Sequence, residues 1–177
     1  MTLPPLKWVP SPNFSARTAK IDLIVIHDCQ GGYDGSIAVF QSRTGVGSGP
    51  VSAHIVLNKD GTEATQMVAF GKKAWHVAAF NSRSIGIEME GFEEKGYPDA
   101  EWGATAETTA YLCHRFGIPP KWAPHGDGPG VCRHLDLGAA GGGHVDPTQD
   151  MGVWQAFLTH VASIYAAGDF PGQPWGR

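Results

Sequence analysis

The sequence predicts an α/β fold: a single domain with a central mixed β-sheet flanked by helices. Three observations support this prediction. Short apolar segments rich in β-branched residues recur at 21–26, 51–57 and 84–90. Two longer segments with helical spacing follow at 104–116 and 153–167. The chain has 177 residues, 42% of them hydrophobic and 17% charged, so it is long enough to bury a core and too apolar for disorder.

The first predicted strand carries a histidine at its end. Residues 21–26 form an apolar run of the kind that is buried on both faces of a sheet, and the run delivers His27 at its C-terminal end. A glycine-rich turn follows. Residues 36–41 then predict a short helix that is capped by Ser36.

Three further strands are expected in the first half of the chain. Residues 51–57 and 62–70 flank Asn-Lys-Asp-Gly at 58–61, which predicts a hairpin turn. Residues 84–90 alternate between apolar and other side chains, so that isoleucine and methionine face one side of the sheet. Glu88 is expected on the opposite side.

The second half of the chain is predicted to be helical around a long loop. Residues 104–116 have helical spacing and end at Gly117, a residue type that commonly ends helices. Residues 121–150 indicate loop structure and hold several histidines. Residues 153–167 predict a final amphipathic helix.

We therefore divide the chain into an N-terminal extension at 1–20, one domain at 21–167 and a Gly/Pro-rich tail at 168–177 that is either loose or a truncated linker. The first residues lack the apolar core of a signal peptide, which indicates synthesis in the cytoplasm. No apolar stretch is long enough to insert into a membrane. A formal net charge of −4 argues against nucleic-acid binding. The oligomeric state is not predicted.

The three cysteines do not predict a disulfide framework, because their number is odd and no CxxC spacing occurs. Cys113 lies on an apolar helix face and is expected in the core. Cys29 and Cys132 each lie two residues from a histidine of interest. They are either ordinary buried thiols or part of the wall of a site.

His27, His134 and Asp146 are candidate metal ligands. Zinc hydrolases use three nitrogen or oxygen ligands from the protein and leave a fourth position for water. His134 and Asp146 lie in a glycine-rich loop, far in the sequence from His27. Spacing alone leaves open the alternative that His27 is a hydrogen-bonded structural residue. His54, in the middle of a predicted strand, is better explained as such a residue.

Six short segments of the chain, in their order, carry a resemblance. They are Ile-Val-Ile-His at 24–27, Val-Ser-Ala-His-Ile-Val-Leu at 51–57, Ala-Trp-His at 74–76, Ser-Ile-Gly-Ile-Glu-Met-Glu-Gly at 84–91, Arg-Phe-Gly-Ile-Pro at 115–119, and His-Leu-Asp at 134–136 with Asp-Pro at 146–147. In these segments the chain resembles the amidase-2 family of N-acetylmuramoyl-L-alanine amidases. That family shares its fold with peptidoglycan recognition proteins and phage lysozyme-amidases.

The resemblance implies a zinc enzyme that cleaves the amide between N-acetylmuramic acid and L-alanine in peptidoglycan or muropeptides. It implies Zn²⁺ ligands at His27, His134 and Asp146. Glu88 matches the catalytic glutamate, and Glu90, two residues on, is the competing candidate. His144 occupies the position of a lysine that steadies the oxyanion in many family members. For substrate contacts the resemblance implies Trp75, His76 and Asn81.

We expect a phage or prophage endolysin that reaches the cell wall after holin-mediated release. Three alternatives remain. The first is a cytoplasmic amidase that recycles muropeptides. The second is a non-catalytic peptidoglycan-binding module of the same fold, although all three ligand positions carry competent residues. The third is a zinc peptidase acting on the stem peptide. We also consider Asp28 as a hydrogen-bond acceptor for the ring of His27.

Overall fold

A six-stranded mixed sheet forms the centre of the molecule, in the order β1-β5-β4-β7-β3-β8. The computed structural model describes residues 2–45, 47, 49–171 and 175–177. The strands are β1 (Leu6–Trp8), β3 (Leu23–Asp28), β4 (Ile55–Leu57), β5 (Ala64–Gln66), β7 (Ser84–Met89) and β8 (Gly130–Arg133). β4, β7, β3 and β8 run parallel, and β5 is antiparallel to β4. This confirms the predicted mixed sheet.

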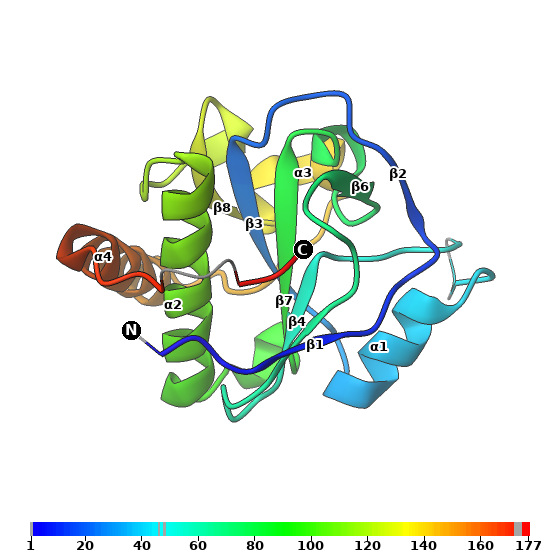
Figure 1. The fold of residues 1–177 in the computed structure, drawn as a ribbon, viewed down its shortest axis with the longest axis horizontal. Coiled ribbons are helices and arrows are strands. Elements are labelled where there is room, and N and C mark those ends of the chain that lie inside the picture. Colours follow the sequence, from blue (N-terminus) through cyan, green and yellow to red (C-terminus); the bar gives the residue numbers. More distant parts are fainter. Residues whose placement is uncertain (1, 46, 48, 172–174) are drawn as a thin grey trace.

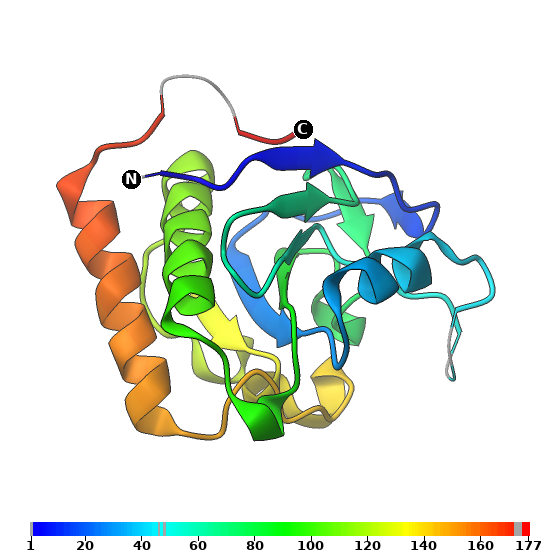
Figure 2. The same ribbon diagram turned by 90° about the horizontal axis from the view of Figure 1, so that it is seen from below.

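The helices cover the two faces of the sheet unequally. α2 (Asp99–Phe116) lies against one face and α4 (Met151–Ala167) packs on the outer side of α2. α1 (Tyr33–Gln41) lies on the opposite side of the sheet (Figure 2). A short helix, α3 (Gly138–Gly141), lies beside a 3-10 turn at Ala78–Phe80. Among the residues described, no helix combines the length and hydropathy needed to cross a bilayer.

The central strand β3 is buried along its whole length because it lies between two other parallel strands. Its side chains alternate between two apolar clusters. Ile24 and Ile26 pack toward α2 and α4, in the cluster that contains Trp154. Leu23 and Val25 face the other way and pack with residues that include Leu137. The side chain that follows in this second row is His27, so the candidate site lies on the face opposite α2.

Several predicted boundaries are wrong, each for a local reason. α1 begins before Ser36, whose hydroxyl donates back to Gly32 O at 2.9 Å instead of capping the helix. Only three residues pair in each of β4 and β5, so the predicted strands at 51–57 and 62–70 are too long. α2 begins at Asp99, directly after Pro98, earlier than predicted.

The region 121–150 also contains an unpredicted strand, β8. Its four residues, Gly-Val-Cys-Arg, are too few for a pattern to emerge from sequence. β8 pairs with β3 and extends the parallel sheet by one strand beside His27. Cys132 on this strand is completely buried against Leu23 and Val25, so it lies in the core and not in the wall of the site. Cys113 is buried in the core, as predicted.

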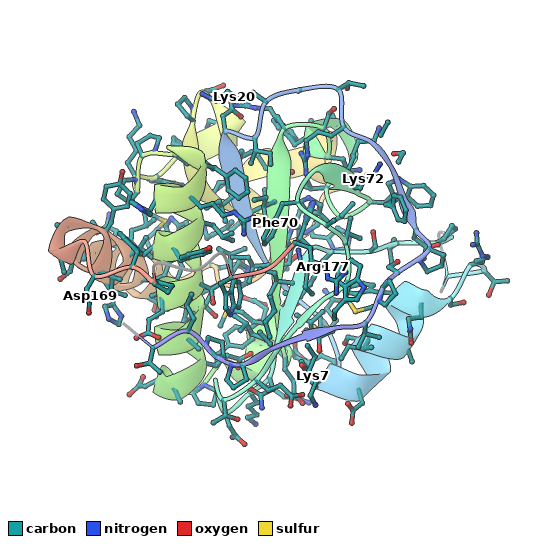
Figure 3. The ribbon with its side chains drawn as sticks, viewed as in Figure 1. Lys7, Lys20, Phe70, Lys72, Asp169 and Arg177 are labelled. Carbon is teal, nitrogen blue, oxygen red and sulfur yellow. The ribbon has the colours of Figure 1, made fainter. Side chains whose placement is uncertain are left out.

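Both ends of the chain pack on the sheet. β1 pairs in parallel with β5, and β2 (Phe14–Ala16) pairs with β6 (Lys72–Ala74). Near the other end, Arg177 O accepts a hydrogen bond from Phe70 N at 3.0 Å, and the chain end lies over the centre of the view in Figure 1. Figure 3 shows Phe70 and Arg177 in the same central area. Residues 175–177 are therefore held against the sheet, which differs from the expected loose tail. Residues 1 and 172–174 lie outside the described part.

Candidate metal centre

Strand register aligns three of the predicted site residues in one row. In the parallel pair β3–β7, His27 lies opposite Glu88. In the parallel pair β3–β8, Ile26 lies opposite Arg133, and His134 follows directly, its backbone N–H donating to Ile26 O at 3.1 Å. His27 and Glu88 thus occupy equivalent places on adjacent strands and face the same side of the sheet. His134 comes one residue after the end of β8, and its Nδ1 lies 2.9 Å from Nδ1 of His27, so it joins the same row.

Asp146 reaches this row from the loop that follows α3. One carboxylate oxygen, Oδ2, lies 3.7 Å from Nδ1 of His27 and accepts a hydrogen bond from Asp28 N at 3.1 Å. The other, Oδ1, lies 3.2 Å from Nδ1 of His134. One ligand atom from each of His27, His134 and Asp146 lies within 4.8 Å of the others, and all three residues are buried. The structure therefore brings together the three predicted ligands.

The chemistry of these donor atoms fits a zinc ion. The two Nδ1 atoms of His27 and His134 lie 2.9 Å apart. His134 uses Nε2 to donate to Gly141 O at 3.0 Å, which in the neutral imidazole leaves a lone pair on Nδ1. Oδ1 of Asp146 is buried and accepts no hydrogen bond from the residues described. Two imidazoles and a carboxylate with a free oxygen form one of the donor sets found in catalytic zinc sites.

The electrostatic environment keeps one ligand histidine neutral and places a carboxylate beside the other. Burial lowers the pKa of His27 well below its ordinary value of 6.5, and the neighbouring His134 and His76 lower it further. His27 is therefore neutral and keeps a lone pair for a metal. Burial also lowers the pKa of His134, but the carboxylate of Asp146 outweighs this effect and the net direction is upward. Asp146 thus attracts positive charge to the point where the ligands converge.

A pocket of about 310 Å³ opens over the ligands. One wall is polar and carries His27, His134, His144, Asp146 and Glu88, and the other is largely apolar and carries Val39, Phe40, Val51 and Trp75. Burial raises the pKa of Glu88 well above its ordinary value of 4.5, and the charges of Asp146 and Asp28 raise it further. A carboxyl group with a raised pKa is suited to accept and return a proton.

The structure places His144 and Trp75 at the pocket. His144 is exposed, and its ring stacks on that of His134 with centroids 4.5 Å apart. Trp75 is partly buried and its indole N–H donates to Ser15 Oγ at 3.1 Å, so the ring is held against the apolar wall. Both residues can contact a bound molecule.

The other two predicted substrate residues are engaged with the protein itself. Asn81 Oδ1 accepts hydrogen bonds from the backbone N–H groups of His76 and Val77, at 2.9 and 2.7 Å. The ring of His76 lines the pocket but also hydrogen-bonds through both of its nitrogens, to His27 and Ser84. Any contact with substrate would have to come from the parts of Asn81 and His76 that these hydrogen bonds leave free.

Other candidate residues near the ligands have contacts of their own. Asp28 accepts a hydrogen bond from the hydroxyl of Tyr97 at 2.6 Å. The ring of His27 hydrogen-bonds to His76, and not to Asp28 as considered from the sequence. Cys29 lines the pocket. Glu90 Oε2 accepts from Lys59 N at 2.8 Å, outside the pocket lining, which leaves Glu88 as the carboxyl group at the ligands. His54 is buried and accepts from Gly86 N through Nδ1, as expected of a structural histidine.

Sequence reasoning missed the brace beneath the ligand loop. Arg133 donates to Asp136 Oδ1 at 2.7 Å and to Thr148 O at 3.1 Å, and its guanidinium lies over the rings of Trp122 and Trp154. It thereby ties the start of the loop, next to His134, to its end, next to Asp146. An arginine and an aspartate three residues apart give a weak signal in sequence, because such pairs usually lie on a solvated surface.

A family model described as N-acetylmuramoyl-L-alanine amidase (Amidase_2) matches residues 17–149, a span that contains all three ligands and Glu88. The chain belongs to this family.

Among its relatives, the N-acetylmuramoyl-L-alanine amidase A of Achromobacter lyticus is 34% identical to this chain over 115 residues. The match covers 63% of each protein. The 1,6-anhydro-N-acetylmuramyl-L-alanine amidase AmpD of Citrobacter freundii is 33% identical, over 61% of this chain and 70% of its own. The chain thus matches about two thirds of the length of these relatives. The hydrolase AmiA of Staphylococcus aureus superposes with a TM-score of 0.72 at 15% identity, covering 95% of this chain and 86% of AmiA, which shows the same fold.

Proposed function

We propose that this amidase-family protein hydrolyses the amide between N-acetylmuramic acid and L-alanine in peptidoglycan or its fragments, with Zn²⁺ held by His27, His134 and Asp146. One observation carries the proposal. A carboxyl group with a raised pKa, Glu88, lies on the strand next to a convergent set of two imidazoles and a carboxylate. This combination suits metal-assisted amide hydrolysis, and the family model covers all four residues.

Each residue has a defined task in this reaction. A bound zinc ion would lower the pKa of a water molecule and polarise the scissile carbonyl. Glu88 takes a proton from the attacking water and passes it to the leaving nitrogen of L-alanine. His144, exposed at the edge of the pocket, donates a hydrogen bond to the developing oxyanion. Trp75 offers an apolar surface to the substrate, His76 lines the pocket near it, and Asn81 holds the backbone that carries His76.

Two biological settings are compatible with this reaction. As an endolysin of a phage or prophage, the protein would act on polymeric cell wall. As a recycling amidase, it would act on soluble anhydro-muropeptides, and the Citrobacter freundii relative carries a name of that kind. The relative specificity constants for intact cell walls and for soluble muropeptides distinguish these settings.

Digestion of purified cell walls by the zinc-loaded protein tests the reaction itself. Mass spectrometry should detect glycan strands free of peptide and stem peptides that begin with L-alanine. A stem-peptide peptidase would instead leave L-alanine on muramic acid, and a binding module would release nothing. Protein depleted of zinc and the variant Glu88→Gln serve as controls, and both should leave the walls intact.

A further inference from the structure

The ring of His76 occupies the space that a side chain at position 86 would fill. Gly86 lies two residues before Glu88 on β7 and faces the same side of the sheet. A Cβ atom built at Gly86 would lie 2.5 Å from Nδ1 of His76, closer than any carbon can approach. Gly86 therefore admits an imidazole directly beneath the row of site residues, next to the ring of His27.

A chain of hydrogen bonds runs from His27 through this imidazole. Nε2 of His27 lies 2.9 Å from Nδ1 of His76, and Nε2 of His76 lies 3.0 Å from Ser84 Oγ. Ser84 Oγ in turn donates to Phe80 O at 2.9 Å. Asn81 fixes the beginning of this segment, because its side chain holds the backbone N–H of His76.

The last acceptor, Phe80 O, sets the direction of every hydrogen bond in this series. A backbone carbonyl can only accept, so the hydroxyl proton of Ser84 points to Phe80 O. Ser84 Oγ must then accept from Nε2–H of His76. A neutral imidazole carries one proton, so Nδ1 of His76 has a lone pair and accepts from Nε2–H of His27. The remaining nitrogen of His27, Nδ1, is left without a proton and faces His134 and Asp146.

We propose that His76 and Ser84 are positioning residues that hold His27 in the tautomer able to bind the metal through Nδ1. This inference rests on the proposed zinc site. The other ligand histidine is fixed differently, because its Nε2 meets a backbone carbonyl, that of Gly141. Of the two ligand histidines, therefore, only His27 has its tautomer set by side chains that can be exchanged. Residues that orient a metal ligand in this way commonly change metal affinity by about 10- to 100-fold.

Proton-detected ¹⁵N spectra of the zinc-loaded protein test the tautomers directly. We expect His27 and His76 each to carry the proton on Nε2, and we expect a coupling or cross-peak that links the Nε2–H of His27 to Nδ1 of His76. A proton on Nδ1 of His76 in the wild-type protein would reverse the chain and overturn the proposal.

Zinc affinity in matched serine variants tests the consequence. Ser84→Ala removes the hydroxyl at the end of the chain and should weaken zinc binding by about 10-fold in a chelator competition. Ser11→Ala is the control, because Ser11 is also buried and its Oγ also accepts one hydrogen bond, from Asn13 N, and donates one, to Phe40 O. It should lower the melting temperature similarly and leave zinc affinity unchanged.

His76→Ala should weaken zinc binding more than Ser84→Ala, and His76→Gln, which keeps an acceptor, should restore part of the affinity. Equal zinc affinity in Ser84→Ala, Ser11→Ala and wild type would overturn the positioning role while leaving the zinc site intact. Wild-type protein that takes up no zinc would overturn both the positioning role and the proposed function. None of these measurements depends on amide cleavage, so the two failures are distinguishable.

Discussion

The two halves of the proposed metal centre are built in different ways. His27 and Glu88 belong to central strands whose residues are all buried, so their positions follow from the packing of the sheet. Asp146 lies on a loop, and His134 begins it, with exposed residues at 142–145 between the two. The sheet side is held by apolar burial, whereas the loop side is held by polar contacts. A site of this kind joins a rigid platform to a segment that needs its own brace.

The brace on the loop side consists mainly of Arg133. Its guanidinium contacts Asp136 and Thr148 O, and the indole N–H of Trp122 donates to Asp136 Oδ2 at 2.9 Å. A buried ion pair gives little net stability compared with apolar packing, but its hydrogen bonds have fixed directions. The loop side therefore gains a defined geometry without a large apolar core.

Removal of one ligand from each half gives the largest expected effect. His27→Ala and Asp146→Ala should each abolish stoichiometric zinc binding and reduce amide cleavage below detection, because two ligands do not hold zinc in a catalytic site. Elemental analysis and muropeptide digestion measure the two quantities. His160→Ala, an exposed histidine on α4, is the control and should match the wild type. Full zinc occupancy in either ligand variant would remove that residue from the site.

Glu88→Gln tests the sheet side without removing a ligand. The variant should keep its zinc and lose about 10²- to 10⁴-fold in turnover, the usual contribution of a general base. Glu90→Gln is the matched control and should stay active, because Glu90 instead accepts a hydrogen bond from Lys59 N.

The pH profile adds a second readout for Glu88. Because burial raises the pKa of Glu88, the wild-type kcat/KM should rise with pH through a value above 4.5 as the carboxyl loses its proton. This acidic limb should be missing from the residual activity of Glu88→Gln. Unchanged turnover in the variant would exclude Glu88 from proton transfer.

Arg133→Met tests the brace on the loop side. It leaves Asp136 buried without its main cation, so the free energy of unfolding should fall by about 3 kcal/mol. Zinc affinity should fall as well, because the two ends of the ligand loop are no longer tied. Urea unfolding and chelator competition provide the measurements. Arg83→Met is the control. It removes an ion pair with Asp22 that measures 2.6 Å and is partly exposed, so only a smaller loss of stability is expected.

The same contrast explains which features the sequence predicts. His27 and Glu88 follow from strand patterns, since apolar runs and alternation define which face a residue occupies. β8, only four residues long, lies below the length at which a pattern can be seen. The convergence of Asp146 on His27 depends on loop geometry and on Arg133, which no local pattern encodes. In this region the family resemblance, and not periodicity, pointed to the proposed ligands.

Glu101→Gln should leave the site unchanged and give the only gain in stability among these variants. Glu101, in the first turn of α2, is fully buried, and neither carboxylate oxygen accepts a hydrogen bond from the residues described. Burial raises its pKa from 4.5 to about 8. The native protein therefore holds a proton that the unfolded chain releases between these values, so stability falls as pH rises through this window. Glutamine stays neutral, and the variant should be more stable by about 4 kcal/mol at pH 8 and nearly equal to wild type at pH 4. Urea unfolding at both pH values measures the difference; a gain that is the same at pH 4 and pH 8 would show that burial of charge at Glu101 is not its cause.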